Sequence, residues 1–297
     1  MSKSFARIAS LASLASLALG AAPLATTATA GTKPALTATV FTGSPAGFLV
    51  DSTLVTGDKD AILIDAQFDL ADAHRLVAMI LESKKNLTTV YVTHSHPDHY
   101  FGLAVIQQAF PNAKLVALPA TVDAIKKTWQ AKVNQWGPLY GTLVPTQPVL
   151  PVALQGTTLT LEGQTLELHG GVQGDDAGNS YVWIPSIRTV VAGDIVYRGV
   201  HVWTAETTPT QRKAWRKTLD QLAALSPAVV IAGHKDPKQN DDAGGLDATR
   251  SYLDAFDAAV ASSKSADEVQ RKVKAKFPEA QLDIILQIGA GAQFAAK

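Results

Sequence analysis

Six consecutive residues, from His94 to His99, restrict the fold and the chemistry of this chain more than any other segment. Their sequence, His-Ser-His-Pro-Asp-His, brings together three imidazoles and one carboxylate, although the whole chain of 297 residues has only seven histidines. The run at 89–93 before this motif is β-branched and apolar, and the run at 100–106 after it begins like a helix. The motif therefore lies on a turn between a strand and a helix, where ligand-binding side chains can converge.

The side chains of this motif are suited to bind metal ions. Neutral imidazole and carboxylate are the groups that zinc prefers when no thiolate is present, and the chain has no cysteine. His94 and His96 lie on the same side of an extended segment, so they can bind one ion together. Asp98 and His99 follow the bend at Pro97 and point elsewhere, which makes them candidates for a second ion. The motif thus predicts a site for two ions.

A His-x-His-x-Asp-His motif after a β-strand resembles the metallo-β-lactamase-fold hydrolases, and other segments resemble this family in the same order along the chain. These segments are three apolar runs that end in a polar side chain: 61–64 before Asp65, 190–192 before Gly193-Asp194, and 229–232 before Gly233-His234. The resemblance covers residues 36–237. It implies an α/β fold, the four-layer αββα sandwich, in which Asp194 bridges two metal ions and His234 is a further ligand.

One segment departs from the pattern of the family. The family usually has a further metal-binding His, often within Gly-His-Thr, before the strand that leads to the bridging Asp. Counting back from the run at 181–185 puts Asp175 at that position. Carboxylate is a competent zinc ligand, so Asp175 is expected to complete the first metal site. His169, Asp176 and the lack of a third protein ligand are the alternatives.

The resemblance implies a zinc-dependent hydrolase that holds about two ions per chain. Metal binding lowers the pKa of water toward about 7, which supplies a nucleophile for a small ester, lactone, thioester or amide, a β-lactam included. The fold serves several chemistries. A metal-binding protein of weak or no activity and an oxidoreductase that uses iron or manganese are therefore the alternatives.

Two residues are the catalytic candidates of this site. Asp98 is expected to bind the second ion and to orient the nucleophile. His201 follows the bridging Asp194 closely and is expected to line the substrate cleft, with a surface His as the alternative. Asp65 is read either as a residue that fixes a histidine tautomer or as a turn residue at a strand end. The aromatic residues within 129–140 either pack a helix or contact substrate.

The composition restricts the classes of partner that the chain can bind. The formal net charge is zero and the isoelectric point is about 7.1, so there is no electrostatic basis for binding nucleic acid or an anionic membrane surface. Hydrophobic residues make up 46% of the chain, which is enough for a large core. A small-molecule substrate is the partner expected, and the oligomeric state is left open.

The first 30 residues have the pattern of a secretory signal peptide. Lys3 and Arg7 form a positively charged start, 8–22 is apolar, and Ala28-Thr29-Ala30 is a small-x-small cleavage site. The apolar run is short for a membrane span. We expect cleavage near Ala30 and a periplasmic or secreted protein without a stable membrane anchor. Residues 31–297 then form the hydrolase domain.

Hydrophobic periodicity predicts two successive sets of strands and helices. In the first set, strands are expected at 36–41, 48–56, 61–65, 90–92 and 115–118, and helices at 70–84, 100–110 and 120–135. In the second set, strands are expected at 159–161, 165–168, 180–184, 189–192 and 229–232, and a helix at 209–225. The closing segment, about 246–297, is expected to hold amphipathic helices at 247–262 and 266–276. Two such halves fit an αββα sandwich with the metal ions between the loops at the strand ends.

Overall fold

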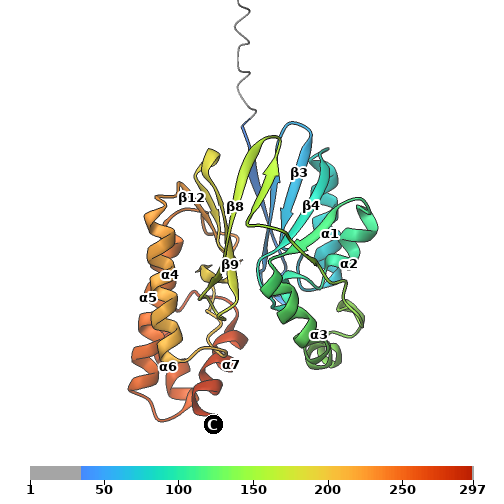
Figure 1. Ribbon diagram of the computed structural model, residues 1–297. Helices are drawn as coiled ribbons and strands as arrows, with labels where there is room; N and C mark the ends of the chain where they lie inside the picture. Colours follow the sequence, from blue (N-terminus) through green and yellow to red (C-terminus); the bar gives the residue numbers. More distant parts are fainter. Residues whose placement is uncertain (1–34, 296–297) are drawn as a thin grey trace, which may run out of the picture. The chain divides into compact units, whose positions relative to one another are not determined.

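The computed structural model describes residues 35–295, so the predicted signal peptide over residues 1–30 lies outside the described residues. Two β-sheets face each other, and helices cover the outer face of each sheet (Figure 1). The fold is therefore α/β, with the four layers expected from the sequence.

The first sheet has the strand order β1-β2-β3-β4-β5-β6. It begins as an antiparallel meander of β1 (Thr37–Thr42), β2 (Asp51–Thr56) and β3 (Asp60–Ile64). The next strands, β4 (Asn86–Val92), β5 (Lys114–Ala117) and β6 (Val152–Ala153), join in parallel. Parallel pairing needs crossovers, which are supplied by α1 (Leu70–Glu82), α2 (Leu103–Ala109) and α3 (Pro119–Tyr140). Because β3 and β4 are parallel, Asp65 and the histidine motif follow them at the same edge of the sheet.

The second sheet has the order β12-β10-β9-β8-β7. Its antiparallel strands are β7 (Thr158–Leu161), β8 (Gln164–Val172), β9 (Asn179–Ile184) and β10 (Thr189–Val191). After α4 (Pro209–Ala224), β12 (Val229–Ile231) pairs with β10 in parallel. A short parallel pair, β11 (Tyr197–Arg198) and β13 (His234–Lys235), follows these two strands, and α5 (Gly244–Ala261), α6 (Ala266–Lys276) and α7 (Asp283–Phe294) close the chain. Within residues 35–295, none of the helices is both long and apolar enough to cross a membrane.

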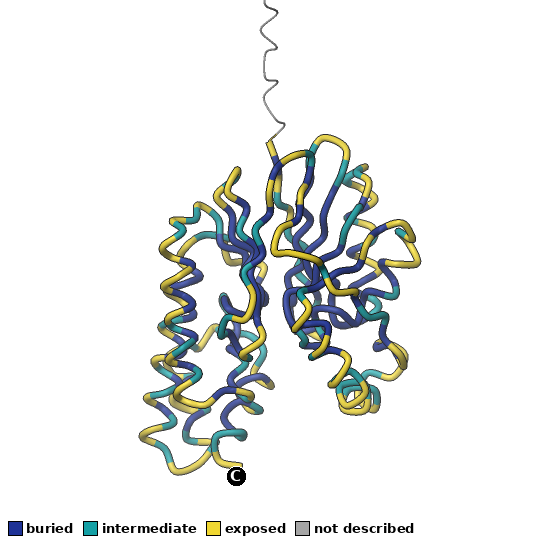
Figure 2. The backbone as a smooth tube through the Cα atoms, in the orientation of Figure 1, coloured by how far each residue is buried: buried dark blue, intermediate teal, exposed yellow. Residues whose placement is uncertain are grey.

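Three apolar cores separate the four layers. Leu63 of β3 packs in the core beneath the first set of helices, whereas its neighbours Ile62 and Ile64 pack in the core between the sheets. This alternation is the period of two that is expected for a strand buried on both faces. Trp215 of α4 and Phe256 of α5 pack in the third core, against the second sheet. Figure 2 shows the same arrangement, with buried backbone along the strands and exposed backbone on the outer sides of the helices.

Every predicted strand and helix is present, but several ends differ. The second strand begins at Asp51 rather than at 48, because Phe48 and Leu49 adopt left-handed φ values of 64° and 53° after the 3-10 helix η1 (Pro45–Gly47). Helix α3 continues past 135 to Tyr140, since Pro138 lies in its last turn and breaks few of its hydrogen bonds. The closing segment holds a third helix, α7, whose second half consists largely of small residues and shows little periodicity.

Within residues 35–295, four further 3-10 helices lie in connections: η2 (Pro97–His99), η3 (Gly141–Leu143), η4 (Pro185–Ile187) and η5 (Gly193–Ile195). Two of them carry candidate metal ligands, because η2 contains Asp98 and His99 and η5 contains Asp194. These tight turns at the ends of strands set the positions of the side chains described next.

Candidate metal centre

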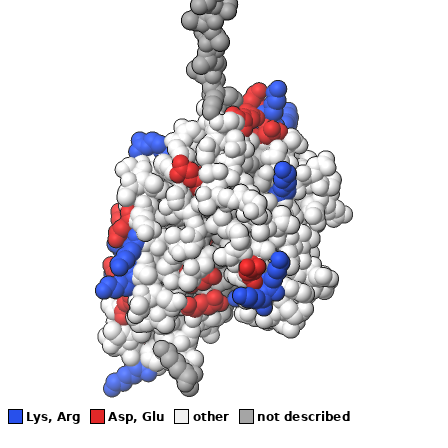
Figure 3. Space-filling view, viewed as in Figure 1, with Lys and Arg blue, Asp and Glu red and all other residues white. Residues whose placement is uncertain are grey.

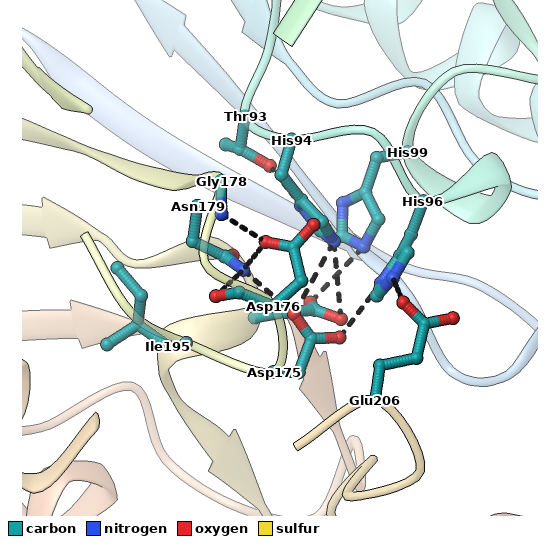
Figure 4. Close-up of polar contacts among 12 residues, drawn as sticks. Thr93, His94, His96, His99, Asp175, Asp176, Gly178, Asn179, Ile195 and Glu206 are labelled. Atoms are coloured by element: carbon teal, nitrogen blue, oxygen red, sulfur yellow. Dashed lines mark hydrogen bonds and ion pairs between the residues drawn. The ribbon is translucent and has the colours of Figure 1, made fainter. Parts of the chain in front are cut away.

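The seven metal-ligand candidates predicted from the sequence come together at the edge where strands of both sheets end. Figure 4 shows four of them, His94, His96, His99 and Asp175. They come from four segments: His94, His96, Asp98 and His99 after β4, Asp175 between β8 and β9, Asp194 after β10, and His234 after β12. Residues that are far apart in sequence thus share one site, because the two sheets pack face to face. Among the described residues they form two groups of four that share Asp194.

Two glycines allow this close approach. Gly193 has a φ of 52°, and a Cβ there would lie 3.1 Å from the Thr93 hydroxyl. At Gly233 a Cβ would lie 2.0 Å from Oδ1 of Asp194, so no side chain fits there. The Gly-Asp and Gly-His pairs read from the sequence are therefore parts of one packing arrangement.

The first cluster consists of His94, His96, Asp175 and Asp194, all buried. His96 Nδ1 lies 2.9 Å from Oδ2 of Asp175. His94 Nε2 lies 3.9 Å from Oδ1 of Asp175 and 3.7 Å from Oδ2 of Asp194. The nitrogen and oxygen atoms of four side chains thus surround one point between the sheets.

The second cluster consists of Asp98, His99, Asp194 and His234. His234 Nε2 lies 3.1 Å from Oδ2 of Asp194 and 3.2 Å from Oδ2 of Asp98. His99 Nε2 lies 3.2 Å from Oδ1 of Asp194 and 3.8 Å from Oδ2 of Asp98. Because the carboxylate of Asp194 belongs to both clusters, it lies where a bridging ligand would be needed.

This donor set fits two metal ions. Within each cluster the ligand atoms lie within 4.8 Å of one another, and ligands about 2 Å from one tetrahedral ion would lie roughly 3.3 Å apart. Among the described residues, His94 Nε2, His99 Nε2 and Asp194 Oδ1 are buried and make no hydrogen bond. A buried polar atom without a partner is unfavourable, and cations in the two clusters would satisfy all three.

Two histidines are held in the tautomer that a metal ligand needs. His99 Nδ1 lies 2.8 Å from Oδ2 of Asp65, and His234 Nδ1 lies 2.7 Å from the carbonyl oxygen of Phe48. Each Nδ1–H donates to its oxygen, which leaves the Nε2 lone pair facing the cluster. Asp65 therefore lies where the first of its two readings puts it, beside a histidine of the motif.

A hydroxyl links the same carboxylate to His94. Thr93 donates its backbone N–H to Oδ1 of Asp65 and its hydroxyl to Oδ2, both over 2.8 Å. The hydroxyl oxygen also lies 3.1 Å from His94 Nδ1. Since the Thr93 proton is used by Asp65, His94 Nδ1–H donates to Thr93, and Nε2 of His94 is again left for the cluster.

His96 is oriented in the opposite sense. Its Nδ1 faces Asp175, and its Nε2 points away from the cluster and lies 3.1 Å from Oε2 of Glu206 (Figure 4). The other oxygen of Glu206 lies 3.2 Å from the ammonium group of Lys132 on α3. The sequence offers no local signal for Glu206, because it is 110 residues away from His96.

Asp175 and Asp194 are held by two side chains that the sequence does not reveal. Asn179 donates to Oδ1 of Asp175 over 2.8 Å. The Tyr197 hydroxyl lies 2.7 Å from Oδ2 of Asp194 and 3.2 Å from Oδ2 of Asp175, and its ring stacks on His234. Burial, and then these two carboxylates, raise the pKa of Tyr197 well above its usual value, so the hydroxyl stays protonated and donates.

The charges of the site call for cations. Burial lowers the pKa of His94, which is therefore a neutral imidazole. Burial also acts to lower the pKa of His99 and His96, but the carboxylates beside them outweigh it and raise both. Burial and the neighbouring Asp194 raise the pKa of Asp175 to about 7, although His96 opposes the shift. Carboxylates crowded out of water in this way are stabilised by a nearby positive charge.

The clusters form the floor of a cleft with apolar walls. Phe48, Phe68 and Trp136 form one wall, with ring centroids 5.0 to 5.5 Å apart. Trp203, Leu282 and Ile285 also line the cleft, and they pack in the same apolar core as the three rings. Asp98, Asp175, Asp194 and His234 line this cleft, so a small molecule in it would meet both clusters.

Comparison with known proteins identifies the family. A model of the metallo-beta-lactamase superfamily matches residues 45–234, which are more than half of the chain and include every candidate ligand. This chain belongs to the metallo-beta-lactamase superfamily. A metallo-beta-lactamase type 2 of Bacteroides fragilis is 24% identical over 186 residues, which cover 62% of this chain and 68% of that protein.

Solved structures agree on the superfamily fold. A metallo-beta-lactamase family protein from Thermus thermophilus is similar with a TM-score of 0.60 and 20% identity, over 87% of this chain and 91% of that one. A beta-lactamase domain protein from Burkholderia ambifaria has the same TM-score and 17% identity, over 88% of this chain and 84% of that one. At these identities the likeness shows the fold, and the site must be argued from this chain's own residues.

The two other residues considered as the third ligand of the first metal site, His169 and Asp176, lie outside both clusters. His169 is half exposed, stacks on Tyr181 at 4.6 Å and lies 3.4 Å from Glu167. Asp176 accepts hydrogen bonds from the backbone of Gly178 and the side chain of Asn179. Of the two clusters found among residues 35–295, neither includes His169 or Asp176.

His201 lines the cleft but stands outside both clusters found in the described part of the chain. Its Nδ1 lies 2.9 Å from the Tyr252 hydroxyl, and its Nε2 lies 3.4 Å from Asp283. Burial lowers its pKa despite the charge of Asp283. His201 is thus a neutral cleft residue held by its neighbours. In the aromatic segment, Trp129 and Trp136 both pack against the core beneath the first set of helices, and Trp136 also lines the cleft.

Proposed function

We propose that this protein is an exported zinc-dependent hydrolase that holds two ions and acts on a small ester, lactone, thioester or amide. The observation that carries the proposal is the pair of ligand clusters that share Asp194 on the floor of the cleft. Family membership supports hydrolysis in general, and the buried imidazole and carboxylate ligands favour zinc.

The assignment of residues follows the two clusters. His94, His96 and Asp175 would hold one ion, Asp98, His99 and His234 the other, and Asp194 both, with Asp175 standing in for a third histidine. When bound, the ions would supply a water nucleophile at neutral pH and a positive charge that stabilises the reacting carbonyl oxygen.

The chain's own side chains would complete the reaction. Asp98 faces the cleft with its Oδ2 beside His234, so its carboxylate can accept a hydrogen bond from the attacking water and orient it. The aromatic wall would exclude bulk water and hold the apolar part of the substrate. His201, which lines the same cleft and is held by Tyr252 through Nδ1, is the second catalytic candidate.

The charges around the cleft favour an uncharged substrate. Among the described residues that line it, Lys132 is the one lysine or arginine, and its ammonium group is paired with Glu206. On the face shown in Figure 3, acidic and basic side chains are interspersed without one broad patch of either sign. We therefore expect neutral esters and lactones to be better substrates than a β-lactam that carries a carboxylate, and no nucleic acid partner.

Export is proposed from the sequence of residues 1–30 alone. Positive, apolar and small-residue segments follow one another there as in a signal peptide. The intact mass of the protein recovered from the periplasm or medium should match a chain that begins at or near Gly31, and a full-length mass would contradict export.

Chelation is expected to abolish hydrolysis, and zinc to restore it. The purified protein would be assayed on neutral aryl esters, a lactone, a thioester and a chromogenic cephalosporin, before and after removal of metal. Addition of zinc to the stripped protein should restore most of the activity, because the proposed site consists of the metal ions and the chain's own side chains. Restoration by iron or manganese but not by zinc would overturn the zinc assignment. Zinc-loaded protein that cleaves none of these substrates would contradict the proposed activity.

A further inference from the structure

His96 differs from the other three histidines of the two clusters. His94, His99 and His234 are fixed through Nδ1, by Thr93, Asp65 and Phe48 respectively. His96 presents Nδ1 to the cluster, so the group that fixes it must lie on the outer side of the ring. Glu206 is the group found there, with its Oε2 3.1 Å from His96 Nε2.

Glu206 and its partners connect the two halves of the fold. Glu206 belongs to the segment between β11 and α4, whereas His96 and Lys132 belong to the first half. Its two oxygens contact His96 and Lys132 separately, over 3.1 and 3.2 Å. The three side chains therefore connect α3, which carries Trp136, with the segment before α4 beside the first cluster.

The segment that carries Glu206 is anchored on both sides. Thr207 donates its N–H and its hydroxyl to the carbonyl oxygen of Thr204. The buried Arg212 donates to the carbonyl oxygen of Thr207 over 2.7 Å. Thr208 begins α4 with a capping box. Although the Glu206 side chain is 42% exposed, its backbone is thus held in place.

We propose that Glu206 is a positioning residue that holds His96 with Nδ1 toward the first cluster, and that Lys132 holds Glu206 in turn. This inference rests on the proposed metal site. His96 Nε2–H donates to the carboxylate, which fixes the ring and makes the Nδ1 lone pair a better ligand. Glu206 touches neither cluster otherwise, so its effect is exerted through His96.

The effect should appear in metal affinity rather than in stability. An exposed ion pair such as Lys132–Glu206 contributes little to the free energy of unfolding. In contrast, removal of an outer partner of a metal-binding histidine lowers metal affinity by about 10- to 100-fold. The two readouts therefore separate a positioning role from a merely structural one.

Zinc affinity would be measured by competition with a chromogenic chelator in four variants. Glu206→Ala should weaken the first zinc site by about 10- to 100-fold, and Glu206→Gln by less, because its amide oxygen still accepts from His96. Lys132→Met should have a smaller effect than Glu206→Ala. Asp254→Asn is the matched control, because Asp254 is an exposed carboxylate that pairs with Arg216, away from the site.

Cobalt(II) loaded into the same variants supplies a second readout. Glu206→Ala should change the visible absorption of the first cobalt site while its melting temperature stays close to that of Asp254→Asn. Zinc affinity and a cobalt spectrum equal to those of the control would overturn the role of Glu206. Failure of the wild-type protein to bind zinc would instead contradict the proposed function, so the two outcomes are distinguishable.

Discussion

His96→Ala is expected to reduce hydrolysis to background and to lower the metal content toward one ion per chain. The substitution removes one of the three side chains that complete the first cluster with Asp194, and it leaves Asp175 facing a cavity. No cysteine is present in the chain to act as an alternative nucleophile. Turnover and zinc content would be measured on the same preparation, so that loss of activity can be related to loss of metal.

His169→Ala is the matched control for this experiment. It removes an imidazole that is 39% exposed and belongs to neither cluster among the described residues. This control should keep both metal content and turnover. A His96→Ala protein with unchanged turnover would rule out the proposed mechanism.

Asp175→Ala should lose roughly one metal equivalent, whereas Asp175→His should restore a three-histidine first site and keep two ions. The first change removes the third ligand of the first cluster, and the second replaces a carboxylate with the neutral imidazole that zinc also accepts. Bound water is less acidic beside a carboxylate than beside a neutral ligand. The rising limb of the pH–rate profile should therefore lie at lower pH in Asp175→His than in the wild type.

The loop around Asp175 leaves little space for a larger side chain. A Cβ at Gly174 would lie 2.8 Å from the Asn179 side chain and 2.9 Å from the carbonyl oxygen of Asp194, so the backbone is already drawn close to the site. The larger imidazole then needs space that Asn179 and Tyr197 occupy. Asp175→Ala reports on the ligand role without this crowding. Unchanged metal content and pH profile in both variants would show that Asp175 is not a ligand.

The sequence predicted those parts of the site that depend on strand ends. Asp194 and His234 each follow a short apolar run, and parallel pairing of β10 with β12 brings the ends of these runs to one edge. The position of Asp175 could be found by counting residues back from the start of the strand that follows it. Periodicity of two and a polar residue after the strand are local properties, so they can be read without the fold.

The partners of these ligands could not be predicted in the same way. Glu206 reaches His96 from the segment before α4, and Tyr197 reaches Asp175 from a two-residue strand. Neither contact leaves a periodic pattern, because each depends on how two distant loops pack. Phe48 lies in a left-handed turn, although the sequence predicts a strand over 48–56. The carbonyl oxygen that holds His234 comes from that turn.

The number of zinc ions per chain tests the central claim most directly. The protein would be expressed in zinc-replete medium, dialysed, and analysed by elemental mass spectrometry against an accurate protein concentration. The two clusters that share Asp194 predict close to two zinc ions per chain. Only trace amounts of transition metal would contradict the account.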